Sequence, residues 1–339
     1  MTKRISVRDV AAEAGVAIGT VSRVLNASGY ASADVRRRVL QAVDRLGYEP
    51  DYTARHLRTG RSRTIGYLLP SIANPFAAIH LSEVERLCQE AGYSLLVGSS
   101  PRPSRDKELV AFFENRRLEG IIASPASEYR HDTPCPFSDT RLPMVVIDRD
   151  LGPAFDSVLI DHAQGMRQVM DYLMSLGHRR VALFALGRDL RPGREKLRGY
   201  TAALQQAGLP FDDRLVYLSD SSLESSRQPM QQMLSLDAPP TAIVAVGTQL
   251  LSGAVHVVRE AGLNVPRDVS VVGIGTLETL ALMYPLPTVL RYNFERSAKA
   301  AVEMMLERIE RPGREEVRRV EIASDLVLGR SCSTVAAAS

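Results

Sequence analysis

The chain has 339 residues, of which 45% are hydrophobic and 24% charged, a composition typical of globular proteins in a length too great for one small core. Its three cysteines, Cys88, Cys135 and Cys332, lie far apart without a CxxC pair, which excludes a disulfide framework and a zinc ribbon and favours a reducing compartment. No apolar run approaches the roughly 18 residues of a membrane helix, and the charged start MTKRISVRDV does not resemble a signal peptide, so we expect a cytoplasmic protein without a membrane partner.

Charge is distributed unevenly along the chain. Of the 42 basic and 39 acidic residues, 12 and 6 lie within residues 1–63, so that segment carries a net charge of +6 and the remainder −3. A basic head on a mildly acidic body predicts a polyanionic partner for the head alone. The same asymmetry also arises by chance in globular chains, so the motifs must decide between the two interpretations.

The first 48 residues predict a compact bundle of three short helices. Ser6 and Asp9 form a capping pair for the first helix, and Gly15 permits a tight turn after it. The apolar spacing places the helices over residues 7–14, over residues 18–25, and between a Ser32 cap and Gly47. Two helices joined by a glycine-containing turn are typical of the helix-turn-helix, although a generic three-helix surface gives the same pattern.

The outer face of the second predicted helix suits DNA. Its exposed positions include hydroxyl and amide side chains, which suit phosphate oxygens. Arg23 lies on the same face and can form a bidentate contact with guanine in the major groove. The following segment, residues 49–63, is an arginine-containing linker that could form one or two helical turns, too few to be stable in isolation.

From Thr64 onward, short β-rich runs alternate with helical patterns. This alternation predicts parallel sheets covered by helices, and its restart near residues 165–180 predicts two lobes. A late amphipathic segment, FERSAKAAVEMMLERIE, is expected to pack on the first lobe. Because open parallel sheets bind ligands beyond their strand C-termini, a cleft between the lobes is the expected pocket.

Motifs for catalysis and cofactors are weak. GIGTLE at residues 273–278 only approximates a dinucleotide-binding GxGxxG, because its third glycine is Glu278. There is no GxxxxGK[ST], GxSxG or HExxH, and the six histidines lack metal-ligand spacing, so we expect no cofactor and no metal. Asp148 and Asp161 end successive strands and could form an acid pair, but hinge and pocket roles are favoured over catalysis.

Two strings carry a family resemblance. VRDVAAEAGVAIGTVSRVLN and YASADVRRRVLQAVDRLGYEPDYTARHLR resemble the head of the lactose-repressor (LacI/GalR) family of bacterial transcription regulators, over residues 7–58 with few gaps. Weaker similarity continues in order through GYLLPSIANPF, LEGIIASP, VVIDRD, GHRRVALF, LRGYTAALQQAGL and NVPRDVSVVGIG, and so over nearly the whole chain.

The resemblance implies a domain plan within the α/β fold class. It consists of an all-α helix-turn-helix head over residues 1–48, a hinge helix or linker over 49–62, and a two-lobed, parallel-sheet core over 63–339 that resembles periplasmic binding proteins. This core would bind an effector and form the dimer. Its N-lobe is expected over about 63–163 and 294–324, and its C-lobe over about 164–293 and 325–339.

The same resemblance implies which residues contact DNA. Three would face base edges, five would face phosphates and two lie in the hinge: Ile18, Gly19 and Arg23; Thr20, Ser22, Asn26, Tyr30 and Ser32; Ala54 and Leu57. Leu57 would wedge between base pairs in the minor groove beside its copy from a second protomer, which requires a homodimer on a pseudo-palindromic operator.

Three positions in this region depart from the family pattern. Ala17 replaces the usual Ser before the second helix, and such a loss of a capping hydroxyl typically costs ~1 kcal/mol. Asp51 replaces the usual Asn near the phosphates. Ile18 offers no hydrogen bond and is expected to read a thymine methyl group or shape.

The resemblance also implies contacts with a small-molecule effector at the strand ends. The matching positions are Ser71, Asn74, Phe76, Asp148, Arg149, Arg194, Lys196, Ser221, Thr248 and Thr276. Lys196 replaces an Arg, Gly247-Thr248 an Asn-Asp pair, and Gly275 an Asp, which removes groups that normally bind sugar hydroxyls.

The groups that remain are basic: Arg149, Arg194, Lys196 and Arg291. They favour an anionic effector, such as a sugar acid, a sugar phosphate or another carboxylate. The alternative is that these side chains only form surface salt bridges.

The resulting interpretation is a sequence-specific transcriptional regulator, most often a repressor in this family, whose operator affinity depends on an effector between the lobes. The direction of that response, induction or co-repression, is not encoded in these motifs. The C-terminal segment carries no leucine heptad, so a dimer is expected rather than a tetramer. The rival interpretations are an α/β metabolic enzyme with a basic N-terminal appendage and a secreted solute-binding protein.

Overall fold

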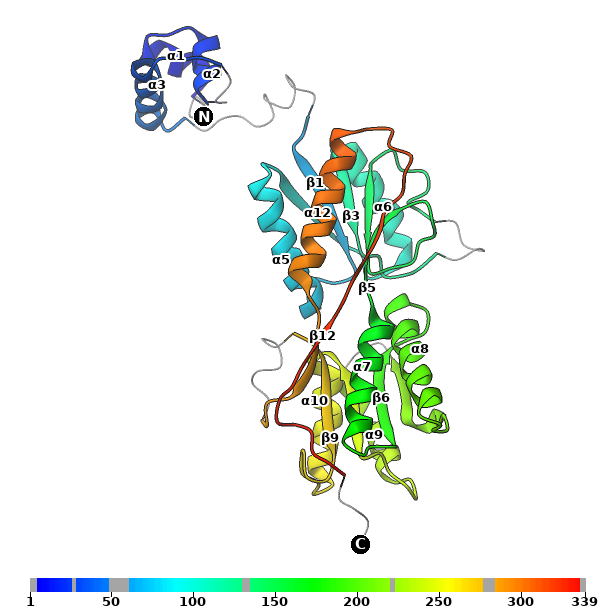
Figure 1. Ribbon diagram of the computed structural model, residues 1–339. Coiled ribbons are helices and arrows are strands. Elements are labelled where there is room, and N and C mark those ends of the chain that lie inside the picture. The colour runs from blue at the N-terminus through cyan, green and yellow to red at the C-terminus, as the bar shows by residue number, and fades with distance from the viewer. Residues whose placement is uncertain are drawn as a thin grey trace. The chain divides into compact units, whose positions relative to one another are not determined.

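The computed structural model describes residues 5–25, 29–48, 61–129, 135–219, 223–276 and 284–335. Two compact units divide the chain, Met1–Ser62 and Arg63–Ser339 (Figure 1). Four residues with expected roles lie outside the described ranges: Asn26, Ala54, Leu57 and Ser221.

The first unit, the head, contains three helices. They are α1 (Val7–Ala14), α2 (Ile18–Leu25) and α3 (Ala33–Leu46). Val10, Val21 and Val39 contribute one fully buried side chain from each helix to a common core. The apolar spacing of the sequence therefore produces the predicted bundle, with α2 held by its valines and its opposite face exposed.

The turn between α1 and α2 requires glycine. Gly15 adopts a left-handed conformation with φ 60°, and its N–H caps the last turn of α1. Arg38 on α3 donates Nη2 to the carbonyl oxygens of Ala14 and Gly15. A Cβ at Gly15 would lie 2.8 Å from that Nη2, so any side chain would disturb both the turn and its anchor on α3.

The second unit, the core, is built on two six-stranded sheets. The first sheet has the order β11-β5-β4-β3-β1-β2, and its neighbouring strands are parallel. Its strands are β1 (Thr64–Leu69), β2 (Ser94–Ser99), β3 (Gly120–Ala123), β4 (Met144–Ile147), β5 (Asp156–Ile160) and β11 (Arg319–Ile322). With α5 (Pro75–Glu90), α6 (Pro103–Asn115) and α12 (Phe294–Glu310), it forms the first lobe.

The second sheet has the order β12-β10-β9-β8-β6-β7 and is parallel except for the antiparallel pair β10–β12. Its strands are β6 (Val181–Leu186), β7 (Val216–Ser219), β8 (Ala242–Val246), β9 (Ser270–Gly275), β10 (Thr288–Arg291) and β12 (Asp325–Val327). The second lobe also contains α7 (His162–Ser175), α8 (Arg191–Gln206), η1 (Asp213–Leu215), α9 (Leu223–Leu234) and α10 (Gly247–Glu260).

The chain passes between the lobes three times. It leaves the first sheet after β5, returns between β10 and α12, and leaves again between β11 and β12 (Figure 1). The late helix α12 packs on α5 and on the first sheet, and its buried Ala298, Ala301 and Met305 join the core there. The three segments that connect the lobes therefore all lie at strand ends. A shift of one lobe would move the residues at these ends.

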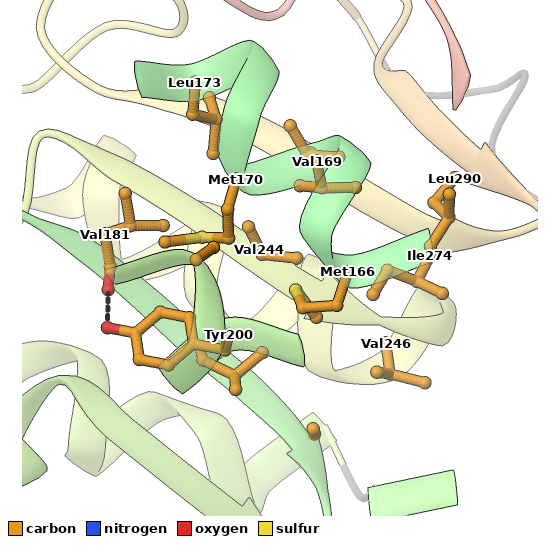
Figure 2. Close-up of a cluster of buried hydrophobic side chains, with 14 of the residues drawn as sticks. Met166, Val169, Met170, Leu173, Val181, Tyr200, Val244, Val246, Ile274 and Leu290 are labelled. Atoms are coloured by element: carbon orange, nitrogen blue, oxygen red, sulfur yellow. Dashed lines mark hydrogen bonds between the residues drawn. The ribbon is translucent and has the colours of Figure 1, made fainter. Parts of the chain in front are cut away.

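The core of the second lobe is dense and apolar. Met166, Val169 and Met170 of α7 pack against strand residues such as Val244 (Figure 2). The hydroxyl of Tyr200 is fully buried and donates to the carbonyl oxygen of Val181 at 2.9 Å, which satisfies its polar group (Figure 2). Such packing favours rigid-body movement of the lobe over internal deformation. Within the described residues, no helix is long and apolar enough to cross a membrane.

Candidate functional site

The exposed face of α2 is the candidate DNA interface of the head. Ile18 is 46% exposed although it is a large apolar residue, and Gly19 and Arg23 are also exposed. Thr20 and Ser22 are half-buried beside them. The buried valines Val21 and Val24 fix which face points outward, so these five side chains form one surface.

Arg23 lies along its own helix in the free head. Its Nε donates to the carbonyl oxygen of Gly19 and its Nη2 to the hydroxyl of Thr20, both at 3.3 Å. These are long hydrogen bonds on an exposed side chain, so they stabilise this conformation only weakly. The guanidinium can therefore leave the helix surface at little cost to bind a base edge.

The other two predicted head residues flank the start of α3. Tyr30 is 88% exposed, so its ring is almost fully available to a partner. Ser32 caps α3, because its hydroxyl accepts a hydrogen bond from the N–H of Val35 at 3.4 Å. A phosphate contact by Ser32 would therefore share the capping hydroxyl.

A pocket of about 110 Å³ lies between the two lobes of the core. Its wall contains the residues that follow β1, β3, β4, β5 and β10, as expected for the carboxyl ends of parallel strands. An adjoining pocket of about 370 Å³ shares Phe76, Leu186 and Val246 with it and extends to Thr248.

Asp148 is the central acid of this cleft. It follows β4 in a left-handed conformation with φ 50°, which is unfavourable for a residue with a side chain. Its carboxylate accepts hydrogen bonds from the N–H of Ile160 at 3.3 Å, from His162 Nε2 at 2.9 Å and from Arg191 Nη1 at 3.2 Å. Burial opposes its charge, but His162, Lys196 and Arg149 together hold the pKa of Asp148 below its usual range.

His162 is neutral in this arrangement. Burial lowers its pKa to about 4, against the opposing effect of Asp148. Because a carboxylate can only accept, Nε2 carries the proton, and Nδ1 accepts from the hydroxyl of Tyr292 at 3.3 Å. His162 therefore links the acid to the aromatic wall without adding charge.

Arg191 connects the lobes across the cleft. This buried residue begins α8 in the second lobe, and its guanidinium contacts Asp148, the carbonyl oxygen of Ile160 and Glu321 in the first lobe. Glu128 accepts a hydrogen bond from the Arg191 N–H at 2.7 Å and forms an ion pair with Arg194 at 2.6 Å. In total, four cations meet three carboxylates around Asp148: Arg149, Arg191, Arg194 and Lys196 against Asp148, Glu128 and Glu321.

Lys196 is 2% exposed and faces the pocket from α8. Its Nζ donates to the carbonyl oxygen of Pro192 at 3.0 Å and lies 5.6 Å from the centre of the Tyr292 ring. Burial lowers the pKa of Lys196 to about 7, and Asp148 limits the shift. An anion bound beside such a lysine would favour its protonated form and so raise its pKa.

Aromatic rings form another part of the pocket wall. Phe76 lies 5.9 Å from Tyr292 and 6.0 Å from Phe294, measured between ring centres. Below them, His80 bonds to the hydroxyl of Tyr67 at 2.7 Å and to that of Ser297 at 3.1 Å. The polar atoms of this wall are thus paired with each other.

The structure brings together most, but not all, of the residues predicted to bind the effector. Seven of the ten line the two pockets: Ser71, Asn74, Phe76, Asp148, Arg149, Lys196 and Thr248. Arg194 does not line either, because its guanidinium is paired with Glu128. Thr276 is buried after β9, also away from both linings. Arg291 forms an exposed ion pair with Asp325 at 3.0 Å, which fits the salt-bridge alternative.

Three further predictions concern Asp161, metal ligands and the GIGTLE motif. Asp161 caps α7 by accepting from the N–H of Gln164 at 3.0 Å, so it forms no acid pair with Asp148. In the described parts of the chain, no group of three His, Cys, Asp or Glu residues could hold a metal ion. Strand β9 ends at Gly275, within the GIGTLE motif, whose last two residues lie outside the described ranges.

The sequence interpretation missed His162, Arg191, Glu128 and Tyr292. Tyr292 directly follows β10 and His162 lies two residues after β5, so the strand-end rule applied to every strand would have found them. Arg191 and Glu128 carry no comparable signal, because they are 63 residues apart and meet only when the lobes are folded together.

Comparison with known proteins agrees with these two units. Residues 6–51 match the family described as bacterial regulatory proteins, lacI family, and residues 170–332 match the periplasmic binding protein-like domain. The HTH-type transcriptional repressor PurR of Erwinia tasmaniensis is 31% identical over 330 residues, covering 96% of each chain. PurR of Photorhabdus laumondii is 31% identical over 332 residues, again covering 96% of each chain.

A solved structure supports the same conclusion for the fold. The crystal structure of the Lac repressor dimer bound to operator and the anti-inducer ONPF aligns with a TM-score of 0.86 at 25% identity, covering 98% of this chain and 100% of that chain. These relatives are named as HTH-type transcriptional repressors, in agreement with the regulator interpretation. The chain belongs to the lacI family of bacterial regulatory proteins and is a DNA-binding transcriptional repressor.

Proposed function

We propose that this repressor binds a pseudo-palindromic operator as a homodimer and that a small anionic effector, held between its lobes, sets its operator affinity. In this scheme residues 1–48 bind DNA, residues 49–62 form the hinge, and residues 63–339 bind the effector and dimerise. The observation that carries the proposal is the charge cluster around Asp148, because both lobes contribute to it and any ligand there changes how they fit together.

On the DNA side, we assign base reading to Ile18, Gly19 and Arg23, and phosphate contacts to the hydroxyls around them. The exposure of Ile18, and of Arg23 with only long hydrogen bonds to its own helix, on one face of α2 supports this assignment. The Lac repressor structure contains operator DNA and a small molecule in one protein of the same family and fold, which supports a dual role here.

On the effector side, the pocket favours a negative charge. Four basic side chains oppose three carboxylates in the cleft, and Asp148 already accepts hydrogen bonds from Ile160, His162 and Arg191. A monoanion would stabilise the protonated form of Lys196, whereas a neutral sugar would add no charge to compensate it. The coupling between effector and operator is then a difference in effector affinity between two lobe geometries.

The experiment that tests this function is a gel shift on the DNA upstream of its own coding sequence. We expect specific binding by the wild type, and a loss of about 10- to 100-fold in Arg23→Ala, because a bidentate arginine–guanine contact contributes ~1–3 kcal/mol. Arg45→Ala is the charge-matched control, since Arg45 is exposed on α3 and near Glu13 rather than on the α2 face. Equal losses in both variants would mean that Arg23 acts only through charge.

The effector arm uses the same complex. Small carboxylates and sugar phosphates are titrated into it in parallel with their neutral counterparts. Acids should change operator affinity, in either direction, and neutral sugars should not. A response to neutral sugars alone would contradict the anionic assignment, while absence of any specific operator binding would contradict the regulatory function itself.

A further inference from the structure

The pocket between the lobes has acceptors that are already used. Oδ1 of Asp148 accepts hydrogen bonds from the N–H of Ile160, His162 Nε2 and Arg191 Nη1, whereas Oδ2 accepts from His162 Nε2 alone among the described residues. A ligand hydroxyl that approaches Oδ1 would have to displace a buried, charge-assisted hydrogen bond. Asp148 therefore serves mainly as a counter-ion inside the protein, and only Oδ2 keeps acceptor capacity for a sugar ring.

Two basic side chains of the pocket, by contrast, keep hydrogen-bond donors that no described residue accepts. Arg149 uses Nε on the carbonyl oxygen of Pro125 and Nη1 on that of Asp148, and its Nη2 has no hydrogen-bond partner among the described residues. The ammonium of Lys196 uses one donor on Pro192 and has two more. These side chains line the pocket from different lobes, Arg149 after β4 and Lys196 on α8, so one carboxylate could bind both.

Most of the remaining pocket wall is apolar or internally paired, and Asn74 and Ser124 are its other polar side chains. Phe76, Tyr292 and Phe294 form a cluster of rings with centre separations of 5.8 to 6.0 Å. Tyr67, His80 and Ser297 bond to one another behind it. A ligand body with many hydroxyls would find few partners here, and each unpaired buried hydroxyl weakens binding. A flat apolar body would instead pack on the rings.

A single ring needs both adjoining pockets. An apolar cavity of ~150 Å³ accommodates benzene, which is more than the 110 Å³ of the first pocket. The adjoining 370 Å³ beside Gly247 and Thr248 shares Phe76 with the first pocket, so a ring with its carboxylate would extend across both. A Cβ at Gly247 would lie 3.5 Å from the Phe76 ring, so the two lobes also come close at the aromatic wall.

We propose that the effector is a planar aromatic monocarboxylate with few hydroxyl groups, whose carboxylate bridges Arg149 and Lys196 and whose ring packs against Phe76 and Tyr292. This inference rests on the proposed function only in taking the pocket between the lobes as the effector site. It narrows the anionic class by excluding polyhydroxylated acids and phosphosugars.

The test is isothermal titration of the full-length protein with matched probes. Benzoate, 4-hydroxybenzoate and cinnamate represent the proposed class, benzamide is the neutral isostere, gluconate the hydroxylated anion and glucose the neutral sugar. At least one aromatic acid should bind, with at least about tenfold higher affinity than benzamide, gluconate and glucose, because the carboxylate forms two charge-assisted contacts.

Variants separate the site from its surroundings. Lys196→Met and Arg149→Gln should each weaken aromatic-acid binding by about 10- to 100-fold. Arg198→Met is the matched control, because Arg198 lies on the exposed face of the same helix and pairs with Glu195; its affinity should equal that of the wild type. Circular dichroism of each variant establishes that it is folded.

Each outcome has a defined meaning. If gluconate binds and the aromatic acids do not, the present inference is wrong and the anionic effector stands. If only glucose binds, both are wrong. If none of the three aromatic acids binds, the aromatic class is wrong. If an aromatic acid binds through Lys196 but leaves operator affinity unchanged, the ligand class is right and the proposed coupling to DNA is wrong.

Discussion

The protein has two regions rich in basic side chains, the head and the cleft of the core, which differ in how exposed those side chains are and in which groups they contact. In the head, Arg23 is exposed, and its hydrogen bonds to other described residues are 3.3 Å long. In the core, Arg191 and Lys196 are 5% and 2% exposed and lie beside Asp148. Exposed charges cost little to maintain and act collectively on a polyanion, whereas buried charges require nearby partners and act individually on a small ligand.

Salt should separate the two regions most strongly. Operator binding through six to ten phosphate contacts should weaken by ~10³- to 10⁵-fold between 50 and 200 mM salt, because counterions are released from DNA. Effector binding by the enclosed cations should change by less than about threefold, because buried charges are poorly screened. Fluorescence anisotropy and calorimetry across this salt range measure the two. A flat operator response would contradict docking through phosphates.

Removal of the buried lysine should stabilise the empty protein. The pKa of Lys196 is lowered from 10.5 to about 7, so the unfolded chain binds more protons between these values and stability rises with pH across that window. At pH 7 the wild type lacks this gain, and Lys196→Met should raise the free energy of unfolding by about 2–4 kcal/mol. Urea unfolding at pH 7 and pH 10 measures it.

The pH dependence supplies an internal control for the stability effect. The advantage of Lys196→Met should shrink toward pH 10, where the lysine of the folded protein is neutral at no cost. An equal advantage at both pH values would indicate better packing of Met and not relief of a buried charge. A less stable variant at pH 7 would show that the Pro192 and Asp148 contacts outweigh burial.

Effector affinity should fall as pH rises above 7. An anion binds the protonated form of Lys196, so binding takes up a proton and weakens by up to tenfold per pH unit above the pKa of about 7. Other groups near Nζ keep their charge state there: the pKa of Asp148 lies below its usual range, His162 is neutral above pH 5, and burial raises the pKa of Tyr292 well above its usual value. Calorimetry at pH 6.5, 7.5 and 8.5 measures the dependence.

Lys196→Arg is the matched variant for this prediction. A guanidinium remains protonated throughout this range, so its profile should be flat wherever the variant binds the effector. A wild-type profile equally flat would exclude Lys196 as the group that faces the anion.

The two regions also differ in how far the sequence predicts them. The head could be predicted from local spacing alone: valines at helical intervals, the caps Ser6 and Ser32, and Gly15 in the turn each depend on neighbours within a few residues. The alternation of strands and helices likewise predicts two parallel sheets, and strand ends point to Asp148.

The ionic connections of the cleft could not be predicted in that way. Arg191 meets Glu321 across 130 residues of sequence, and Arg194 is occupied by a glutamate 66 residues away. Which cation faces the ligand and which is neutralised depends on the fit of two lobes, a property of long-range geometry and not of residue type. The family resemblance therefore predicted a basic pocket, while the structure shows which of its donors are already paired.

The smallest expected effect concerns two glycines of the head. A Cβ at Gly19 would meet no atom within 4 Å among the described residues, and glycine within a helix is less stable than alanine by about 0.5–1 kcal/mol. Gly19→Ala should therefore protect α2 against hydrogen–deuterium exchange in the full-length protein. It should nonetheless weaken operator binding by about threefold or more, because the added methyl group lies on the face assigned to the bases.

Gly15→Ala is the contrasting variant, because φ 60° and the contact with Arg38 make any side chain there unfavourable. In Gly15→Ala, exchange protection and operator affinity should fall together, as expected when folding limits binding. In Gly19→Ala they should move in opposite directions, which only a functional constraint on that bare surface explains. If Gly19→Ala binds every tested DNA within twofold of the wild type, this part of α2 does not approach the bases, and the exposed face must act through Arg23 and the hydroxyls alone.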